Sequence, residues 1–254
     1  MLGVRVDDVT EAEAAAEVRR LIQSGGCHQV VTPNAEFVVR ARRDPAFLKA
    51  LNAAALAVPD GAGLLLAGRL LGTPLRQQVT GTDLVVRLAE LGAAEGYRLF
   101  LLGAAEGVAA EAARRLQARF PGLQIAGTYA GSPRPGDEDA IVERIRAASP
   151  VHVLLVAYGA PAQDLWIARN LPRLGVGVAI GVGGAFDFVS GRVPRAPAWL
   201  RRAGFDWLYR LARQPWRWRR QLALPQFVLA VLWESLRRRT RNHRWIQIHT
   251  DEHR

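Results

Sequence analysis

Short apolar runs alternate with longer mixed segments from residue 28 to residue 186 of the chain. The runs are apolar throughout and have the length of strands, and they lie at residues 28–34, 55–61, 97–103, 123–131, 151–159 and 175–186. A strand that is apolar on both faces is typical of a parallel sheet with helices on both sides. The pattern therefore predicts an α/β fold, Rossmann-like and doubly wound, with a mostly parallel sheet.

The segments between these runs are rich in alanine and have a helical pattern. They predict helices at residues 35–53, 62–71, 82–95, 104–120, 137–148 and 163–171. The first 18 residues combine apolar and acidic side chains, as helices do, whereas a signal peptide needs a basic region followed by an apolar one. The N-terminal sequence therefore gives no indication of secretion.

Charge is distributed unevenly along the chain. Residues 190–254 contain 15 arginines and four acidic residues, which accounts for the whole formal charge of +11, whereas residues 1–189 contain 19 basic and 19 acidic residues. Six of the seven tryptophans also lie in this C-terminal part. We therefore expect a neutral core at residues 1–190 and a basic helical appendage at residues 191–254, whose partner is anionic.

The appendage is compatible with three functions: binding nucleic acid, lying on a membrane surface, or forming a solvated basic helix. Its longest apolar run, residues 222–233, contains a proline and is shorter than the roughly 20 residues needed to span a bilayer. Large apolar side chains interleaved with arginines favour a helix on an anionic membrane surface over nucleic acid. These side chains are Tyr209, Trp216, Leu222, Phe227, Val231 and Trp233.

Polar and glycine residues follow the predicted strands at their carboxyl ends. In doubly wound sheets ligands bind at this edge. We therefore expect one site built by several strand ends, from Thr32, Asn34, Asp60, Gly61, Gly103, Gly159, Gln163, Gly183, Gly184 and Asp187.

Three of these residues have a structural and a functional interpretation. Asp60 either caps the next helix or is a carboxylate that takes a proton from a hydroxyl nucleophile, and the local sequence does not separate the two. Gly103 opens a glycine turn that either holds a phosphate or only joins a strand to a helix. Gln163 is an unusual residue for a helix cap, which favours an amide that faces a ligand.

Metal-binding patterns are weak in this sequence. Asp137, Glu138 and Asp139 form a D-x-D pattern, which many nucleotide-sugar enzymes use to hold a metal, but acidic residues are also common in the first turn of a helix. The helix-start interpretation is favoured. We therefore predict no metal and no cofactor.

Several motifs, in order along most of the chain, resemble the WecG/TagA/CpsF glycosyltransferase family. They are TPNAEFVVRAR (32–42), VPDGAGL (58–64), VTGTDL (79–84), FLLGAAEGVA (100–109), GAPAQDLWI (159–167), GVGGAFDFVSGRVPRAPAW (181–199) and DWLYRLARQPWRWRRQ (206–221). The last two are the most specific.

The resemblance implies an inverting, metal-independent transfer of a sugar, N-acetylmannosamine or a related hexose, from a UDP-sugar to a saccharide on a polyprenyl diphosphate. The enzyme would act peripherally at the cytoplasmic face of a bacterial inner membrane, in the synthesis of teichoic acid or other surface polysaccharide. Asp60 would be the general base. Substrate would be bound by Thr32, Asn34, Gly103, Gln163, Asp187, Arg210, Arg217 and Arg220.

The sequence departs from the family pattern in three places, one of which is Asp206-Trp207 where the family has EW before LYRL. The usual PKQE is PAQD, which puts Ala162 and Asp164 where the family has lysine and glutamate. An arginine usual before VTG is Gln78, so that Arg76, two residues earlier, is our predicted substitute in binding the substrate's charge.

Two other functions are compatible with parts of the sequence. A Rossmann sheet also suits a dinucleotide-dependent oxidoreductase, but the glycine turn lacks the full G-x-G-x-x-G spacing and no acidic residue ends a strand about 20 residues later. A non-catalytic adaptor could use the basic appendage alone to bind a membrane or nucleic acid.

Overall fold

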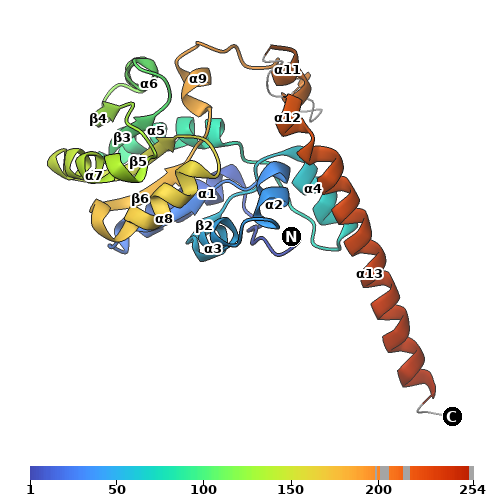
Figure 1. The fold of residues 1–254 in the computed structure, drawn as a ribbon. Helices are drawn as coiled ribbons and strands as arrows, with labels where there is room; N and C mark the ends of the chain where they lie inside the picture. The colour runs from blue at the N-terminus through green and yellow to red at the C-terminus, as the bar shows by residue number, and fades with distance from the viewer. Residues whose placement is uncertain (198, 201–205, 214–217, 252–254) are drawn as a thin grey trace.

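In the described part of the chain, six parallel strands form one sheet in the order β2-β1-β6-β5-β3-β4 (Figure 1). The structure is a computed structural model; it describes residues 1–197, 199–200, 206–213 and 218–251, and the side chains of 206, 210, 219, 220 and 238–251 lie outside the description. The strands are β1 (His28–Val31), β2 (Leu56–Ala57), β3 (Arg98–Gly103), β4 (Gln124–Tyr129), β5 (Val151–Ala157) and β6 (Val176–Gly181). The predicted α/β fold with a parallel sheet is confirmed.

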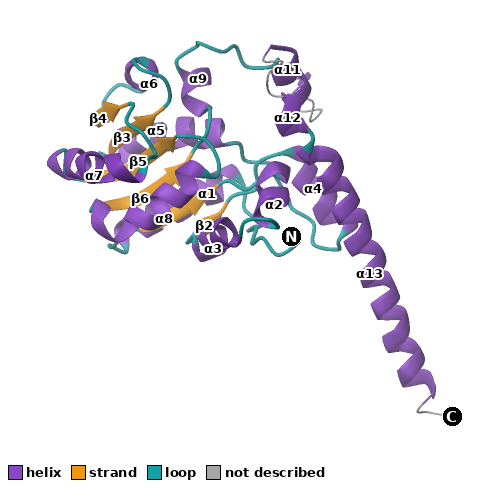
Figure 2. Ribbon diagram, in the orientation of Figure 1, coloured by secondary structure: helices purple, strands orange, loops and turns teal. Residues whose placement is uncertain are grey.

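Helices cover both faces of this sheet (Figure 2). Those of the core are α1 (Glu11–Gln23), α2 (Ala35–Ala41), α3 (Pro45–Ala53), α4 (Ala62–Leu70), α5 (Gly81–Glu95), α6 (Val108–Arg119), η1 (Pro135–Asp137), α7 (Glu138–Ala147), α8 (Ala162–Leu174) and α9 (Ala185–Val189). The C-terminal helices are α11 (Asp206–Arg213), α12 (Trp218–Gln221) and α13 (Ala223–Asp251).

Neighbouring residues of a strand pack into different cores because successive side chains point to opposite faces. Val30 belongs to the cluster under α1, α5, α6 and α9, whereas Val31 belongs to the cluster under α2, α3, α4 and α13. Leu101 and Leu102 divide in the same way, and Leu102 packs under α7 and α8. All four side chains are fully buried, which explains why β3 and the end of β1 are apolar without alternation.

Two predicted helices have different bounds in the structure. The segment 35–53 is not one helix, because Asp44 caps a new helix at Pro45 and residues 42–44 separate α2 from α3. The helix predicted at 104–120 starts only at Val108, since Ala104 and Gly107 both have positive φ. A left-handed residue cannot continue a right-handed helix.

The first part of α13 returns to the core and packs against α2 and α4 (Figure 1). Phe227 and Val231 are 3 % and 2 % exposed and belong to the same cluster as Phe47 and Leu64. The expectation that Phe227 and Val231 face a membrane is therefore wrong, whereas Trp233 is exposed. Trp216 lies outside the described residues, and the division of the chain at residue 190 stays a prediction.

The described helices were compared with the requirements for crossing a bilayer. None of them, α13 included, is both long enough and apolar enough to do so.

Candidate active site

The carboxyl ends of β1 and β6 are joined at the centre of the sheet. The buried Thr32 hydroxyl, directly after β1, donates to the Gly181 carbonyl at 3.1 Å. Gly81, at the start of α5, also reaches this point, because a Cβ on it would lie 3.9 Å from Thr32 Oγ1 and 3.4 Å from the Val182 carbonyl oxygen. The VTGTD segment therefore forms one wall of the site.

Asp60 follows β2 and lies beside the end of β1. Its backbone N–H donates to the Pro33 carbonyl at 2.9 Å, and the preceding Pro59 carbonyl accepts from Val79 at 2.8 Å. Asp60 itself is partly exposed. The loop therefore joins Asp60 to the ends of two other segments of the site.

Gly61 makes the turn between Asp60 and α4. Its φ of +116° is strained for any residue with a side chain, and a Cβ on it would lie 3.9 Å from Asn34 Cβ. Asn34 itself caps α2, with its Oδ1 accepting from Phe37 N–H at 3.0 Å. Gly61 occupies the N-cap position of α4, so Asp60 lies one residue before the cap.

Gln163 connects the loops that follow β5 and β6. Its side-chain oxygen accepts from Gly159 N–H at 3.1 Å and from Gly183 N–H at 2.9 Å, and the residue is 1 % exposed. These bonds give Gln163 a task in shaping the site. Its predicted contact with substrate stays a prediction.

Asp164, the next residue, is fully buried. Neither oxygen of its carboxyl has a hydrogen-bond partner among the described residues, and Asp164 Oδ1 would be 2.8 Å from a Cβ on Gly181. Burial raises the pKa of Asp164 to about 7, despite the adjacent Gln163 amide and the backbone, which both lower it. A carboxyl of this kind holds a proton near neutral pH.

The glycine turn after β3 has a structural explanation. Gly103 has a φ of +103°, and a Cβ on it would lie 2.8 Å from the Ala157 carbonyl carbon of β5. Only glycine fits this close approach of two strands. The predicted role of Gly103 in binding substrate stays a prediction.

The segment after β6 folds over the start of α5. Arg195 Nη2 lies 2.8 Å from Asp83 Oδ1, and Thr80 donates its hydroxyl to the other oxygen of that carboxylate at 2.6 Å. Asp187, in α9, accepts from Val193 N–H through its backbone carbonyl at 3.0 Å. These contacts hold residues 187–196 next to the VTGTD wall of the site.

Comparison with known proteins decides what kind of site this is. The sequence model described as "Glycosyl transferase WecG/TagA/CpsF family" matches residues 1–241. The chain belongs to this family. It is therefore a glycosyltransferase, as the motifs predicted, and neither the oxidoreductase nor the non-catalytic adaptor.

Curated relatives of this glycosyltransferase cover most of its length. A protein of Bacillus spizizenii is 36% identical over 225 residues, which is 89% of this chain and 86% of the relative. A protein of Bacillus subtilis is 32% identical over 211 residues, 83% of this chain and 81% of the relative. One of Staphylococcus aureus is 28% identical over 233 residues, 91% of each. All three are named N-acetylglucosaminyldiphosphoundecaprenol N-acetyl-beta-D-mannosaminyltransferase.

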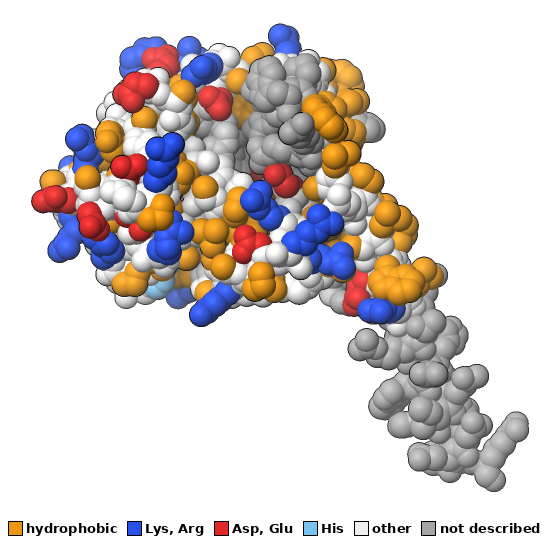
Figure 3. All heavy atoms as spheres, in the orientation of Figure 1, with side chains coloured by type: hydrophobic (Ala, Val, Ile, Leu, Met, Phe, Trp, Pro, Cys, Tyr) orange, Lys and Arg blue, Asp and Glu red, His pale blue; other side chains and the backbone are white. Residues whose placement is uncertain are grey.

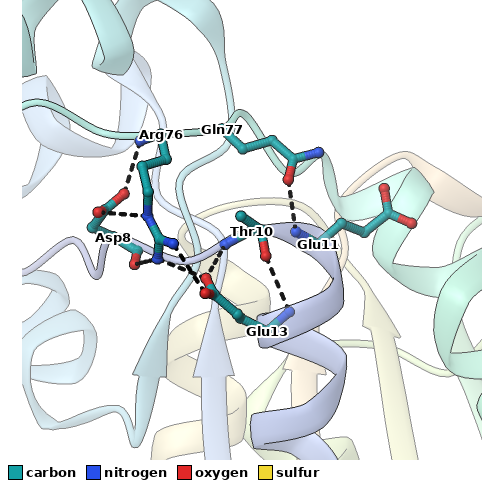
Figure 4. Close-up of polar contacts among 6 residues, drawn as sticks. All are labelled: Asp8, Thr10, Glu11, Glu13, Arg76 and Gln77. Atoms are coloured by element: carbon teal, nitrogen blue, oxygen red, sulfur yellow. Dashed lines mark hydrogen bonds and ion pairs between the residues drawn. The ribbon is translucent and has the colours of Figure 1, made fainter.

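Arg76 of the glycosyltransferase forms ion pairs with two acidic residues of the N-terminal segment (Figure 4). Its guanidinium lies 2.9 Å from the Asp8 carboxylate and 2.7 Å from that of Glu13, and it also donates to the Asp8 carbonyl. These contacts raise the pKa of Arg76 and tie the loop before α5 to the start of α1. They give Arg76 a structural task, and its predicted contact with substrate stays a prediction.

The D-x-D residues lie at the start of α7, as the helix-start interpretation predicted. Glu138 pairs with Arg169 at 2.6 Å and Asp139 pairs with Arg173 at 2.6 Å, both in α8. Within the described residues there is no group of three His, Cys, Asp or Glu side chains placed to hold a metal ion.

The three predicted arginines of the appendage are only partly covered by the structure. Arg210 lies in α11 and Arg220 in α12, but their side chains are outside the described residues, and Arg217 is outside them altogether. What the structure does place is the start of α13, since a Cβ on Gly63 would lie 3.9 Å from Phe227 Cε1. The appendage therefore returns to within one helical turn of the Asp60–Gly61 loop.

Sequence reasoning missed two parts of this site. The pairing of Arg195 with Asp83 spans 112 residues, and the packing of Phe227 on Gly63 spans more. The first pair carried a signal, because Asp83 and Arg195 lie in the family motifs VTGTD and VPRAP, but a motif does not state which residue it contacts.

Proposed function

We propose that this glycosyltransferase moves N-acetylmannosamine, or a closely related hexose, from a UDP-sugar to a polyprenyl-diphosphate-linked saccharide. The names of the relatives support this substrate class, since they specify an N-acetylmannosaminyl group and an acceptor on diphosphoundecaprenol. The family model covers both this core and most of the appendage, which supports a shared acceptor type. The pathway would be the synthesis of teichoic acid or another surface polysaccharide.

The observation that carries the proposal is the position of Asp60. It is partly exposed at the carboxyl end of a parallel strand, it lies one residue before the N-cap of α4, and its loop contacts Pro33 and Asn34 of the neighbouring strand end. In a doubly wound sheet this is the edge where ligands bind.

The proposed reaction is a single displacement with inversion at the anomeric carbon. A hydroxyl oxygen of the acceptor attacks that carbon, the bond to the UDP oxygen breaks, and the hydroxyl proton passes to the Asp60 carboxylate. A sugar hydroxyl has a pKa far above 7, so proton removal in the transition state is the task of a general base. The electron pair of the broken bond leaves with UDP.

The negative charge that develops on UDP needs a cationic or hydrogen-bonding partner. We propose that Arg210, Arg217 and Arg220 supply it, together with binding of the acceptor's diphosphate, and that no metal ion is needed. Support comes from the density of arginine in residues 206–221 and from the packing of α13 beside the Asp60 loop. Thr32, Asn34, Gln163 and Asp187 would orient the sugar and nucleotide.

The enzyme would act peripherally on an anionic membrane surface at the cytoplasmic face of a bacterial inner membrane. Its acceptor would be lipid-linked, as the names of the relatives state for theirs. The cationic appendage supplies the matching charge.

The testing experiment measures transfer from a panel of UDP-sugars to a lipid-diphosphate acceptor, with wild-type protein and Asp60→Asn. We expect Asp60→Asn to lower turnover by about 10²–10⁴, because a general base contributes that much. Binding of UDP should stay within a few-fold of wild type, since the substitution removes charge and not shape.

The matched control is Asp44→Asn. Asp44 caps α3 through Oδ1 at 3.0 Å from Phe47 N, and asparagine caps a helix equally well, so this variant should keep full activity. The same assay run in EDTA should show unchanged transfer. Normal turnover by Asp60→Asn would refute the assigned base, and strict dependence on Mn²⁺ would refute the metal-free mechanism.

A further inference from the structure

Helix α13 has apolar side chains on two opposite sides. On one side Phe227, Ala230 and Val231 are buried against α2 and α4. On the other side the exposed side chains from residue 228 to residue 236 are all apolar, and they are Val228, Leu229, Leu232, Trp233 and Leu236. Figure 3 shows hydrophobic side chains gathered along the described part of this helix. Burial in the core thus accounts for only part of the apolar surface of the described side chains of α13.

Helix α4 continues this exposed surface. Gly63 of α4 approaches Phe227, and Ser235 donates its hydroxyl to the Leu70 carbonyl at 3.3 Å, so the two helices run side by side in the same direction. Leu66 and Leu70, one and two turns after Gly63, lie along this line and are 60 % and 53 % exposed. We define the α4–α13 face as Leu66, Leu70, Val228, Leu229, Leu232, Trp233 and Leu236.

The charges around the α4–α13 face are arranged for an anionic partner. Arg69 is exposed between the two leucines of α4, and Arg237 lies with its guanidinium carbon 5.0 Å from the centre of the Trp233 ring. Within residues 222–237 the one acidic residue is Glu234, three residues after the buried Val231 and thus on the packed side of α13. Apolar side chains with arginines at their border, and an acid only on the opposite side of the helix, are the pattern of a helix in a lipid interface.

We propose that the α4–α13 face docks on the anionic surface of a lipid bilayer, and that a helix of the catalytic core, α4, is therefore part of the membrane contact. This inference rests on the membrane partner in the proposed function, but it extends that contact beyond the basic appendage. A second copy of this chain is a poorer occupant, because pairing two such faces would bring arginine against arginine.

The docking of α4 has a consequence for the reaction. Asp60 and Gly61 come directly before α4, and the helix from Gly61 to Leu70 is at most about 14 Å long at 1.5 Å per residue. A bilayer against Leu66 and Leu70 thus holds Asp60 within about one short helix length of the headgroups. The diphosphate of a polyprenyl lipid lies at that level, so the face sets the height of the base above its acceptor.

The experiment measures binding to vesicles of mixed phosphatidylglycerol and phosphatidylcholine by flotation. We expect the double variant L66E/L70E to bind at least about tenfold more weakly than wild type, because it removes two apolar side chains and places two carboxylates against anionic headgroups. The variant L66S/L70S, which adds no charge, should lose several-fold.

The matched control is A110E/A118E. It adds the same two charges at exposed positions of α6, which joins β3 to β4 at the opposite end of the sheet from α4. The net charge of the two variants is equal, so a general electrostatic effect would weaken both alike. We expect A110E/A118E to bind vesicles nearly as wild type does.

Each outcome decides something. Equal binding by L66E/L70E and A110E/A118E, or unchanged binding by L66S/L70S at an unchanged melting temperature, would overturn the proposal. A wild-type dimer in sedimentation that L66E/L70E dissociates, with vesicle binding intact, would assign the face to a second copy instead. Flotation needs no turnover, so failure of the proposed transfer reaction would leave this test readable.

Discussion

Two adjacent buried residues at the start of α8 differ in whether their polar side-chain atoms are hydrogen-bonded. The Gln163 oxygen accepts two backbone N–H groups, whereas the Asp164 carboxyl has no partner among the described residues. A buried carboxyl of this kind is stable only as the neutral acid. Its protonation therefore links the stability of the fold to pH.

The predicted effect can be isolated with Asp164→Asn. Burial raises the pKa of Asp164 from 3.8 to about 7, so the folded state holds a proton that the unfolded chain releases between these values. The carboxyl's contribution to stability is therefore greatest below pH 4 and is lost as the pH rises toward 7. Relative to Asp164→Asn, the free energy of unfolding of wild type should fall by roughly 3 kcal/mol between pH 5 and pH 8.

Urea unfolding of both proteins at the two pH values measures this difference, and other titrating groups cancel because both proteins share them. A difference that does not change with pH would show that the Asp164 carboxyl is ionised in the fold.

For individual residues, the sequence predicted the place of a side chain in the sheet better than it predicted the contacts of that side chain. Thr32, Asn34 and Asp60 could be assigned to one edge of the sheet because each follows an apolar run. The ion pairs of Arg76 with Asp8 and Glu13 could not, since their partners are 68 and 63 residues away and nothing local specifies them.

Among the elements, α13 is the one whose packing the sequence did not reveal. Its apolar residues would suit a lipid surface as well as a protein core. They pack into the core because α2 and α4 present apolar side chains to them, in the cluster that contains Phe47 and Leu64. The break between α2 and α3 did have a local signal, because aspartate followed by proline marks a helix start. The apolar period that continues across residues 42–44 masks this signal.

We predict that Phe227→Ala loosens α13 from the core. Phe227 is 3 % exposed, and a Cβ on Gly63 would lie 3.9 Å from its ring, so its truncation removes buried surface and leaves a cavity. Such changes cost about 3–5 kcal/mol. Hydrogen exchange of the α13 amides should become faster, together with a lower melting temperature.

Leu229→Ala, on the exposed side of the same helix, serves as the control and should change stability by less than about 0.5 kcal/mol. Equal effects of the two substitutions would contradict the packing of α13 described above.

At the scale of the whole molecule, the separation of charge is the dominant feature. The chain up to residue 189 is formally neutral, and the entire +11 lies beyond it. Exposed charges are screened by salt, whereas apolar contacts are not weakened by it. Binding to a membrane should therefore have two components that salt can separate.

We predict that association with anionic vesicles falls steeply between 0.05 and 0.5 M NaCl but keeps a residual part that salt does not remove. Flotation across this salt series measures both parts. The residual part should be missing in L66E/L70E and present in A110E/A118E. Binding that salt abolishes completely in wild type would show that charge alone holds the protein on the surface.

The return of α13 to Gly63 also fixes an order of events in synthesis. The loop that carries Asp60 is made early, but the segment that packs beside it is made after every strand of the sheet. A growing chain that has completed its sheet still exposes the apolar surface of α2 and α4 against which Phe227 packs. The packing beside the Asp60 loop is thus completed only after residues 227–231 have been made.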